Sequence, residues 1–221
     1  MSAATAPRRR TGGWEAATLR ALMYPANIVL GGVVAFLLAL PLVTALPVAV
    51  ALGRSLSTWH VESDDAVVTN LLRELRATWR RTWRLGVAVG IALFLLAADV
   101  LFLLSRLGTP SEGLAVVVGG ATLPVACVVV LAALLVPVAA ARDRQGDVRA
   151  WLTDALGIAT GTPARTAAIF LLTCGIVATC IALPTLAPFV LMSLPLDLAV
   201  RAWPALPAAG GAGTGTSGDG E

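Results

Sequence analysis

The chain has 221 residues, of which 57% are hydrophobic and 13% are charged, against roughly 45–50% and about 25% in an average soluble domain. A soluble domain of this size cannot bury so much apolar surface, because most of its residues contact the outside. The composition therefore indicates an all-α, polytopic bundle of membrane helices. The net charge is +3, all 16 basic residues are arginines and no nucleic-acid-binding motif is present, so nucleic acid is not an expected partner.

The first apolar run contains no charged residue between Arg20 and Arg54. We predict one membrane crossing over 26–52, since a bilayer requires about 20 apolar residues. This core is roughly twice as long as that of a cleaved signal peptide, which favours a retained helix. Pro41 and Pro47 leave a second arrangement open, in which the run enters the membrane and returns.

The rest of the chain contains three further apolar runs. They predict crossings at 85–107, 114–141, 164–183 and 186–202. The last two crossings come from a single run that is too long for one helix. Pro184 and Pro188 lie near its middle, where a turn is expected. Both ends of the chain, 1–13 and 207–221, are expected to be flexible because they are rich in small and polar residues.

The arginines predict an orientation. Six lie in 53–84 and four in 142–165, whereas the linker 105–113 holds one. With five crossings, the two arginine-rich segments and the C-terminus are cytoplasmic in a cell (plasma) membrane, and the N-terminus is outside. The arginines of the N-terminal segment disagree with that arrangement. A first run that returns would place them in the cytoplasm instead.

Residues 70–84 predict a cytoplasmic amphipathic helix beside the second crossing. Leu71, Leu75, Trp79 and Trp83 recur every four residues, which places them on one face. Arginines form a second stripe, and Glu74 is spaced to pair with them along the helix. Tryptophan beside arginine is typical of a helix at the membrane surface, although a docking surface for a partner protein has the same composition. The candidate lipid or partner surface comprises Arg73, Arg76, Trp79, Arg80, Trp83 and Arg84.

Asp99 is an acidic residue near the middle of the second predicted crossing, where an ionised carboxylate is costly. We expect it to be neutral, hydrogen-bonded to a neighbouring helix through Thr44 or Thr122, or exposed to a water-filled cavity. Proton or ion transport generally needs a relay of such groups, so a packing role is favoured over a direct functional one. Asp197 and Arg201 are four residues apart with the acid first, which predicts a helical pair that anchors the last crossing.

Small residues suggest where helices approach one another. Gly86 and Gly90 are spaced by four, as are Ala115 and Gly119, and this spacing permits close contact between membrane helices. The cysteines, which all lie in apolar runs, are expected to be small buried hydrophobic residues and not a disulfide or metal site. They are Cys127, Cys174 and Cys180.

Motifs for enzymatic chemistry are missing from the sequence. There is no HExxH, GxSxG or P-loop, and a single histidine, His60, is too little for a histidine-based metal or catalytic cluster. We expect His60 to be solvated in a loop. No catalytic, cofactor-binding or metal-binding residue is predicted, and no cofactor is expected.

Residues 45–90, ALPVAVALGRSLSTWHVESDDAVVTNLLRELRATWRRTWRLGVAVG, resemble the YesL-like family of small bacterial membrane proteins. The resemblance lies in Pro47, in an arginine and an aromatic residue at Arg54 and Trp59, in the acidic turn 62–65, and in the basic-aromatic helix that follows. It implies a five-to-six-helix integral membrane protein, and an accessory role in carbohydrate uptake.

Three classes of function remain. The sequence favours a non-enzymatic accessory or regulatory component of a membrane transport system, with transporter subunits and membrane lipid as partners. A transporter or permease component in its own right is the alternative, but it should contain more polar intramembrane residues or an internal repeat. A membrane enzyme is the weakest class, because the chain lacks the motifs described above.

Overall fold

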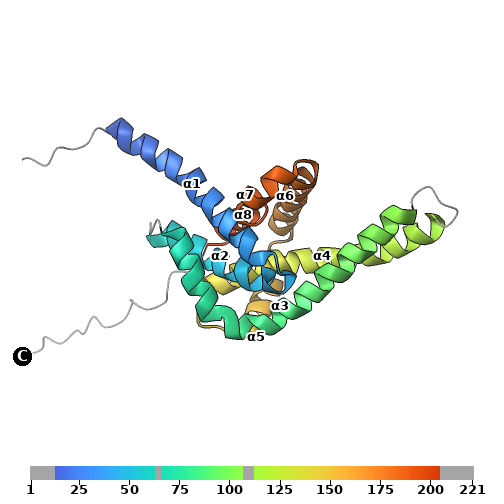
Figure 1. The fold of residues 1–221 in the computed structure, drawn as a ribbon. Helices are drawn as coiled ribbons and strands as arrows, with labels where there is room; N and C mark the ends of the chain where they lie inside the picture. The colour runs from blue at the N-terminus through green and yellow to red at the C-terminus, as the bar shows by residue number, and fades with distance from the viewer. Residues whose placement is uncertain (1–12, 63–65, 107–111, 205–221) are drawn as a thin grey trace, which may run out of the picture.

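A computed structural model describes residues 13–62, 66–106 and 112–204. Every regular element within these ranges is a helix, which confirms the all-α fold (Figure 1). The helices are α1 (Gly13–Ala39), α2 (Leu42–Glu62), α3 (Val67–Arg106), α4 (Glu112–Arg142), α5 (Val148–Gly161), α6 (Pro163–Ala182), the short 3-10 helix η1 (Pro184–Leu186), α7 (Ala187–Val190) and α8 (Ser193–Ala202). The flexible ends expected at 1–13 and 207–221 lie outside the described residues, apart from Gly13 at the start of α1.

The expected single crossing over 26–52 is wrong, because two helices occupy this stretch. The chain breaks at Leu40 and Pro41, where proline lacks an N–H and disfavours helical geometry in the residue before it. Helix α1 then folds back along α2. The ring of Tyr24 in α1 stacks on Trp59 near the end of α2, with 5.5 Å between centroids. Pro47 lies inside α2 and does not interrupt it.

Helix α3 joins two predicted elements, the amphipathic helix 70–84 and the crossing 85–107, into one helix of 40 residues. Its first part packs along α2. A Cβ added to Gly86 would lie 2.5 Å from the carbonyl oxygen of Val43, and one added to Gly90 would lie 3.1 Å from the Val43 Cα. The expected role of these glycines in close helix contact is therefore confirmed.

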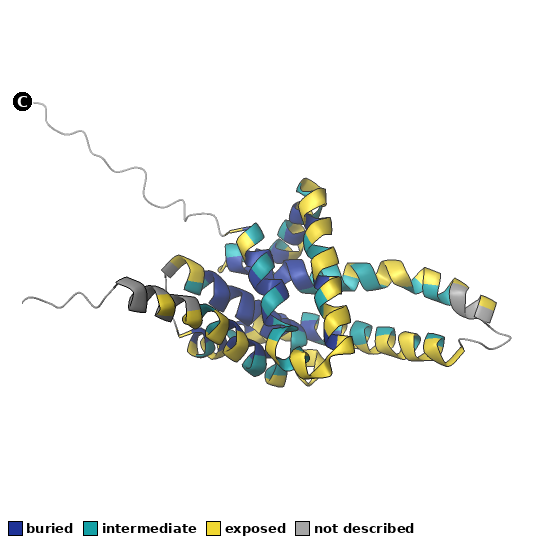
Figure 2. Cartoon of the chain, turned by 90° about the horizontal axis from the view of Figure 1, so that it is seen from above, coloured by how far each residue is buried: buried dark blue, intermediate teal, exposed yellow. Residues whose placement is uncertain are grey.

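Beyond Gly90, α3 pairs with α4 and the two helices project from the body as an arm (Figures 1 and 2). A Cβ added to Gly119 of α4 would lie 3.2 Å from the Leu103 side chain of α3. The outer surface of this arm carries exposed Phe94, Leu101 and Val128. The rest of the molecule, called the body below, differs from the arm because most buried residues lie there (Figure 2).

Helix α2 lies at the centre of the body. Its residues between Leu46 and Ser57 are all buried, and they contribute to two hydrophobic clusters. One cluster surrounds Trp151 of α5 and includes the end of α4 and part of α8. The other joins α2 to α1, to the start of α3 and to Leu196 of α8. The most buried helix is thus the one that carries Arg54.

Helix α5 was not predicted, although 142–165 carries local signals for it. Asp147 caps its start, with its carboxylate accepting a hydrogen bond from the Ala150 N–H at 2.8 Å. Trp151, Ala155 and Ile158 follow at helical spacing and are buried on one face.

The C-terminal run forms a second hairpin. Helix α6 ends before Pro184, close to the expected turn, and the returning half is broken by 42° between α7 and α8. The end of α8 meets the start of α6. Trp203 donates from its indole N–H to the Thr162 hydroxyl at 3.1 Å, and Arg165 donates to the Ala202 carbonyl at 2.9 Å.

Five helices in the described ranges are long and apolar enough to cross a membrane, and the bent pair of η1–α7 and α8 could supply a sixth crossing. The count of five agrees with expectation, but the identity of the spans differs, because the first predicted span is two helices and the last is a bent pair. Large apolar side chains such as Leu30, Leu95 and Ile181 are exposed on these helices. Lipid is the solvent that covers such surfaces, so the fold is that of a membrane protein.

Candidate functional site

The predicted lipid or partner surface lies on the outer side of α3. All six of its residues are exposed, including Trp79 and Trp83, which are 40% and 44% exposed. The Arg84 guanidinium lies over the Trp83 ring, 5.6 Å from its centroid. The opposite side of the same helix carries Thr78 and Thr82, which are buried. The six residues, Arg73, Arg76, Trp79, Arg80, Trp83 and Arg84, are called the basic-aromatic surface below.

The expected leucine and tryptophan face is only partly correct. Leu71 is fully buried and Trp83 is exposed, although both belong to the same four-residue repeat. A step of four residues overshoots one helical turn by about 40°, so the repeat rotates away from α2 along the helix. Leu71 therefore belongs to the core, whereas the two tryptophans border the arginines on the outside.

Behind this surface, Arg54 of α2 is 5% exposed, and each of its three guanidinium nitrogens donates a hydrogen bond. Its Nε donates to the Ala140 carbonyl at 3.0 Å, and its Nη2 donates to the Arg144 carbonyl at 3.0 Å. Its Nη1 donates to the Glu74 carboxylate at 3.2 Å. The guanidinium also lies 5.0 Å from the centroid of Trp151. A buried charge requires such partners, and here they tie together α2, α3, α4 and α5.

The expected pairing of Glu74 with arginines of its own helix is wrong. Its carboxylate turns inward to Arg54, and its other oxygen lies 3.7 Å from Arg144. Arg144 also donates to the hydroxyl of Thr58. Glu74 therefore supplies the carboxylate shared by Arg54 and Arg144, and leaves the exposed arginines of α3 without this counter-charge.

A second buried network surrounds Asp197 of α8, which is fully buried. Its carboxylate accepts a hydrogen bond from the Tyr24 hydroxyl at 2.7 Å and lies 2.7 Å from Nε2 of His60. The predicted pair with Arg201 is confirmed at 3.1 Å. Arg201 also covers the Tyr24 ring, 4.7 Å from its centroid.

The expectation that His60 is a loop residue without a specific role is therefore wrong, although the residue is exposed. It lies in the last turn of α2, stacks on Trp59 and binds Asp197. No local pattern in the sequence predicts this contact. A charged residue in the last apolar run, at Asp197, was the one available signal that a partner had to exist elsewhere in the chain.

Asp99 lies in the projecting arm and is half-exposed. The expected hydrogen bonds do not form: the Thr44 hydroxyl donates to the carbonyls of Leu38 and Pro41, and the Thr122 hydroxyl donates to Gly119. Within 13–62, 66–106 and 112–204, no residue forms a hydrogen bond or ion pair with Asp99. The cost of this carboxylate in lipid is therefore not offset inside the described part of the chain.

Metal-binding chemistry finds no support in the same ranges, which contain no group of three His, Cys, Asp or Glu side chains able to hold a metal ion. The cysteines are free thiols, but only Cys180 is buried, while Cys127 is half-exposed and Cys174 exposed. The expectation that all three are buried is wrong, since α6 turns Cys174 toward its outer side. The acidic turn 62–65 lies outside the described side chains.

No family model, curated protein or solved structure matches the chain.

Proposed function

We propose that this chain is a non-enzymatic accessory or regulatory component of a membrane transport system, and that it binds a partner subunit through the basic-aromatic surface of α3. The observation that carries the proposal is a division of charge. Arg54 and Asp197 form hydrogen bonds and ion pairs inside the protein, whereas the arginines at 73, 76, 80 and 84 are exposed. A surface that serves only internal stability would not need them.

The composition of this surface suits recognition of an acidic protein face. Guanidinium groups form bidentate contacts with carboxylates, and neighbouring indoles add a large apolar area at low entropic cost. Lipid headgroups can meet the same residues, so membrane contact accompanies the proposed docking. Carbohydrate uptake, as the transport process served, rests on the family resemblance of residues 45–90.

The fold also supports an orientation in which the start of α1, the end of α2, the start of α6 and the end of α8 all lie on one side of the membrane. The α1–α2 turn brings Tyr24 beside His60, and Arg165 lies against Ala202. With the ends of both hairpins and the loop after α4 on the cytoplasmic side, every arginine except Arg106 lies there. This arrangement agrees better with the positive-inside rule, by which arginines concentrate in cytoplasmic segments, than an external N-terminus does.

A transporter in its own right is the weaker proposal. Alternating access requires a polar binding site between helices, formed by side chains or by broken backbone. The two buried charges in the described body are held by several partners each. They are therefore not available to a hydrophilic substrate such as a sugar without breaking these networks.

Copurification from native membranes tests the docking role. The tagged chain is compared with a variant carrying Arg76→Lys, Arg80→Lys and Arg84→Lys, which keeps the charge and removes the planar fork. We expect the parent to retain a transporter permease or ATPase, and the triple variant to lose it while remaining in the membrane. The matched control is Arg81→Lys with Arg149→Lys, two exposed arginines outside the surface, which should retain the partner.

Two outcomes contradict the proposal. If the triple variant retains the partner as well as the control does, the basic-aromatic surface is a lipid anchor and the docking site lies elsewhere. If the parent itself brings down no transport subunit, while its complex is stable enough to survive mild detergent, the accessory role is wrong.

A further inference from the structure

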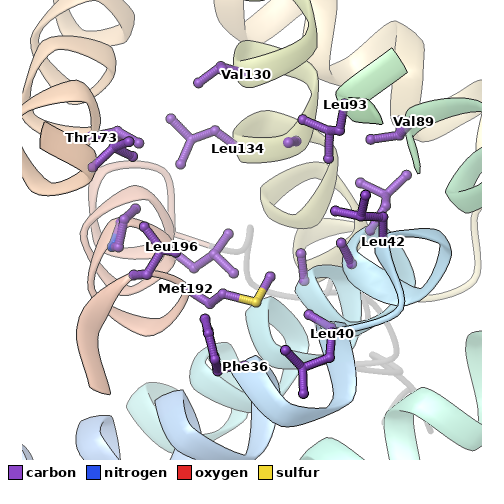
Figure 3. Close-up of a pocket in the computed structure, with 18 residues that line it drawn as sticks. Phe36, Leu40, Leu42, Val89, Leu93, Val130, Leu134, Thr173, Met192 and Leu196 are labelled. Atoms are coloured by element: carbon purple, nitrogen blue, oxygen red, sulfur yellow. The ribbon is translucent and has the colours of Figure 1, made fainter. Parts of the chain in front are cut away.

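A cavity of about 430 Å³ lies between the two hairpins and α3–α4 (Figure 3). Six long or broken membrane helices contribute to its wall. Representative side chains are Phe36 of α1, Leu46 of α2, Leu93 of α3, Leu134 of α4, Thr173 of α6 and Leu196 of α8. Its volume is within the range of about 300–1,000 Å³ that is typical of ligand pockets.

The wall offers almost nothing to a polar molecule. Thr173 supplies the one polar side chain that lines the cavity, and its hydroxyl donates to the Ile169 carbonyl of its own helix at 2.8 Å. Ordered water requires two to four polar partners, and an apolar cavity without them stays dry and accepts apolar ligands. The chemistry therefore selects an aliphatic occupant.

The rim of the cavity is also apolar. Leu40 and Leu42 flank the α1–α2 turn and Val177 lies on α6, and all three are exposed large hydrophobic residues. In a membrane protein such residues face lipid, so the entrance opens toward the bilayer. An occupant would enter from the hydrocarbon and not from water.

Size separates a lipid chain from a partner helix. A helix with its side chains is about 10–12 Å across, so a partner helix would have to spread the helices that line the cavity, whereas an extended alkyl chain is much thinner and can enter between their side chains. We propose that this cavity binds one acyl chain of a membrane phospholipid, inserted between the α1–α2 turn and α6–α8.

The small residues of the wall allow the cavity to be closed. Ala133 of α4 lines it, so Ala133→Phe places a ring in the space that the acyl chain would occupy. Ala121, three turns earlier on the same helix, is exposed on the arm. Ala121→Phe is thus a matched control with the same substitution in the same helix.

The test uses the full chain in nanodiscs of phosphatidylcholine that carries a photoreactive diazirine in its acyl chain. After illumination, mass spectrometry maps the adducts. We expect labelling at cavity residues such as Leu134, which is buried, and Met192, loss of these adducts in Ala133→Phe, and retention in Ala121→Phe. A parallel sample with a diazirine fatty acid distinguishes the source, since a phospholipid site gives little labelling there.

Three results would overturn the proposal. Adducts confined to outward residues such as Leu171 and Ile181 would show that the lipid chain stays outside. Equal cavity labelling in both variants would show that the acyl chain does not occupy the space beside Ala133. Strong labelling by the fatty acid alone would assign the cavity to a different ligand. If Ala133→Phe fails to fold, Ala45→Leu, a smaller substitution in the α2 part of the wall, replaces it.

Discussion

Nε2 of His60 and Oδ1 of Asp197 lie 2.7 Å apart although 137 positions separate them in the chain. Tyr24 and Arg201 complete the same carboxylate site, so the first, second and last helices meet at one buried charge. Hydrophobic contacts tolerate small shifts of one helix along another. A fully buried carboxylate does not, because its hydrogen-bond donors must lie within bonding distance. The site therefore determines how α8 docks.

Replacing Asp197 with alanine should lower the free energy of unfolding by at least about 1–3 kcal/mol, because the Tyr24 hydroxyl, His60 and Arg201 lose their shared acceptor. Tyr24→Phe removes a single hydrogen bond and should cost about 1 kcal/mol. Unfolding in mixed detergent micelles measures both changes. Asp154→Ala is the control, since Asp154 forms a partly exposed pair with Arg142 at 3.5 Å and should cost less than about 1 kcal/mol. Equal losses for the two aspartates would contradict a structural role for Asp197.

Arg54→Lys should destabilise the fold despite the retained charge. One ammonium cannot reach Ala140, Glu74 and Arg144 together, and each buried acceptor left without a donor costs about 1–3 kcal/mol. Arg81→Lys, at an exposed position of α3, should change stability by no more than about 0.5 kcal/mol. The same unfolding assay compares the two, and a tolerated Arg54→Lys would mean that the guanidinium fork is not required.

The sequence predicted the helical membrane class and several local features, and missed the contacts between distant segments. Glycine spacing correctly indicated the close approach of α3 to a neighbour, because spacing along one helix is a local property. Pro41 indicated a possible return, but the choice between one span and two depended on what α1 could pack against. His60 and Glu74 were misread for the same reason, since their partners lie on other helices and no local pattern encodes them. All six residues of the candidate surface are exposed, but the four-residue repeat placed the two tryptophans on one face with Leu71, which is buried. The residues themselves do not identify the binding partner.

Gly86→Ala should destabilise the α2–α3 contact. The new methyl group would lie 2.5 Å from the Val43 carbonyl oxygen and 2.8 Å from Cδ of Pro47, both of which are held by the backbone. Overpacking of this kind typically costs about 1–3 kcal/mol. Gly175→Ala in α6 is the matched control, because nothing lies within 4 Å of the added carbon, and alanine should stabilise that helix by about 0.5–1 kcal/mol. Opposite signs in the unfolding assay are the expected result.

The proposed orientation predicts that the N-terminal segment and the end of α2 lie on the same side of the membrane. Single cysteines at positions 5 and 61, in a background without the three native cysteines, should both be protected from an impermeant thiol reagent in intact cells; Val61 is 72% exposed. Both should react once the membrane is permeabilised. A cysteine at position 109, in the linker between α3 and α4, should react without permeabilisation. Reaction at position 5 but not at 61 would instead support a single first crossing.

Asp99→Leu should leave the fold intact or stabilise it, because the carboxylate has no hydrogen-bonding partner in the described part of the chain and leucine is favoured in lipid. Asp99→Asn should also fold. Thermal stability in detergent and copurification with the partner are measured together. A folded Asp99→Leu protein that loses a partner would identify Asp99 as a contact between subunits. A marked loss of stability would instead reveal a partner within the chain.

The convergence of α1, α2 and α8 on Asp197 has a consequence for biosynthesis. The ribosome releases Tyr24 and His60 long before it has made their acceptor, so the nascent chain must hold an incomplete polar site among apolar helices until translation is almost finished. A chain interrupted after α6 would keep Tyr24 and His60 permanently without their shared acceptor.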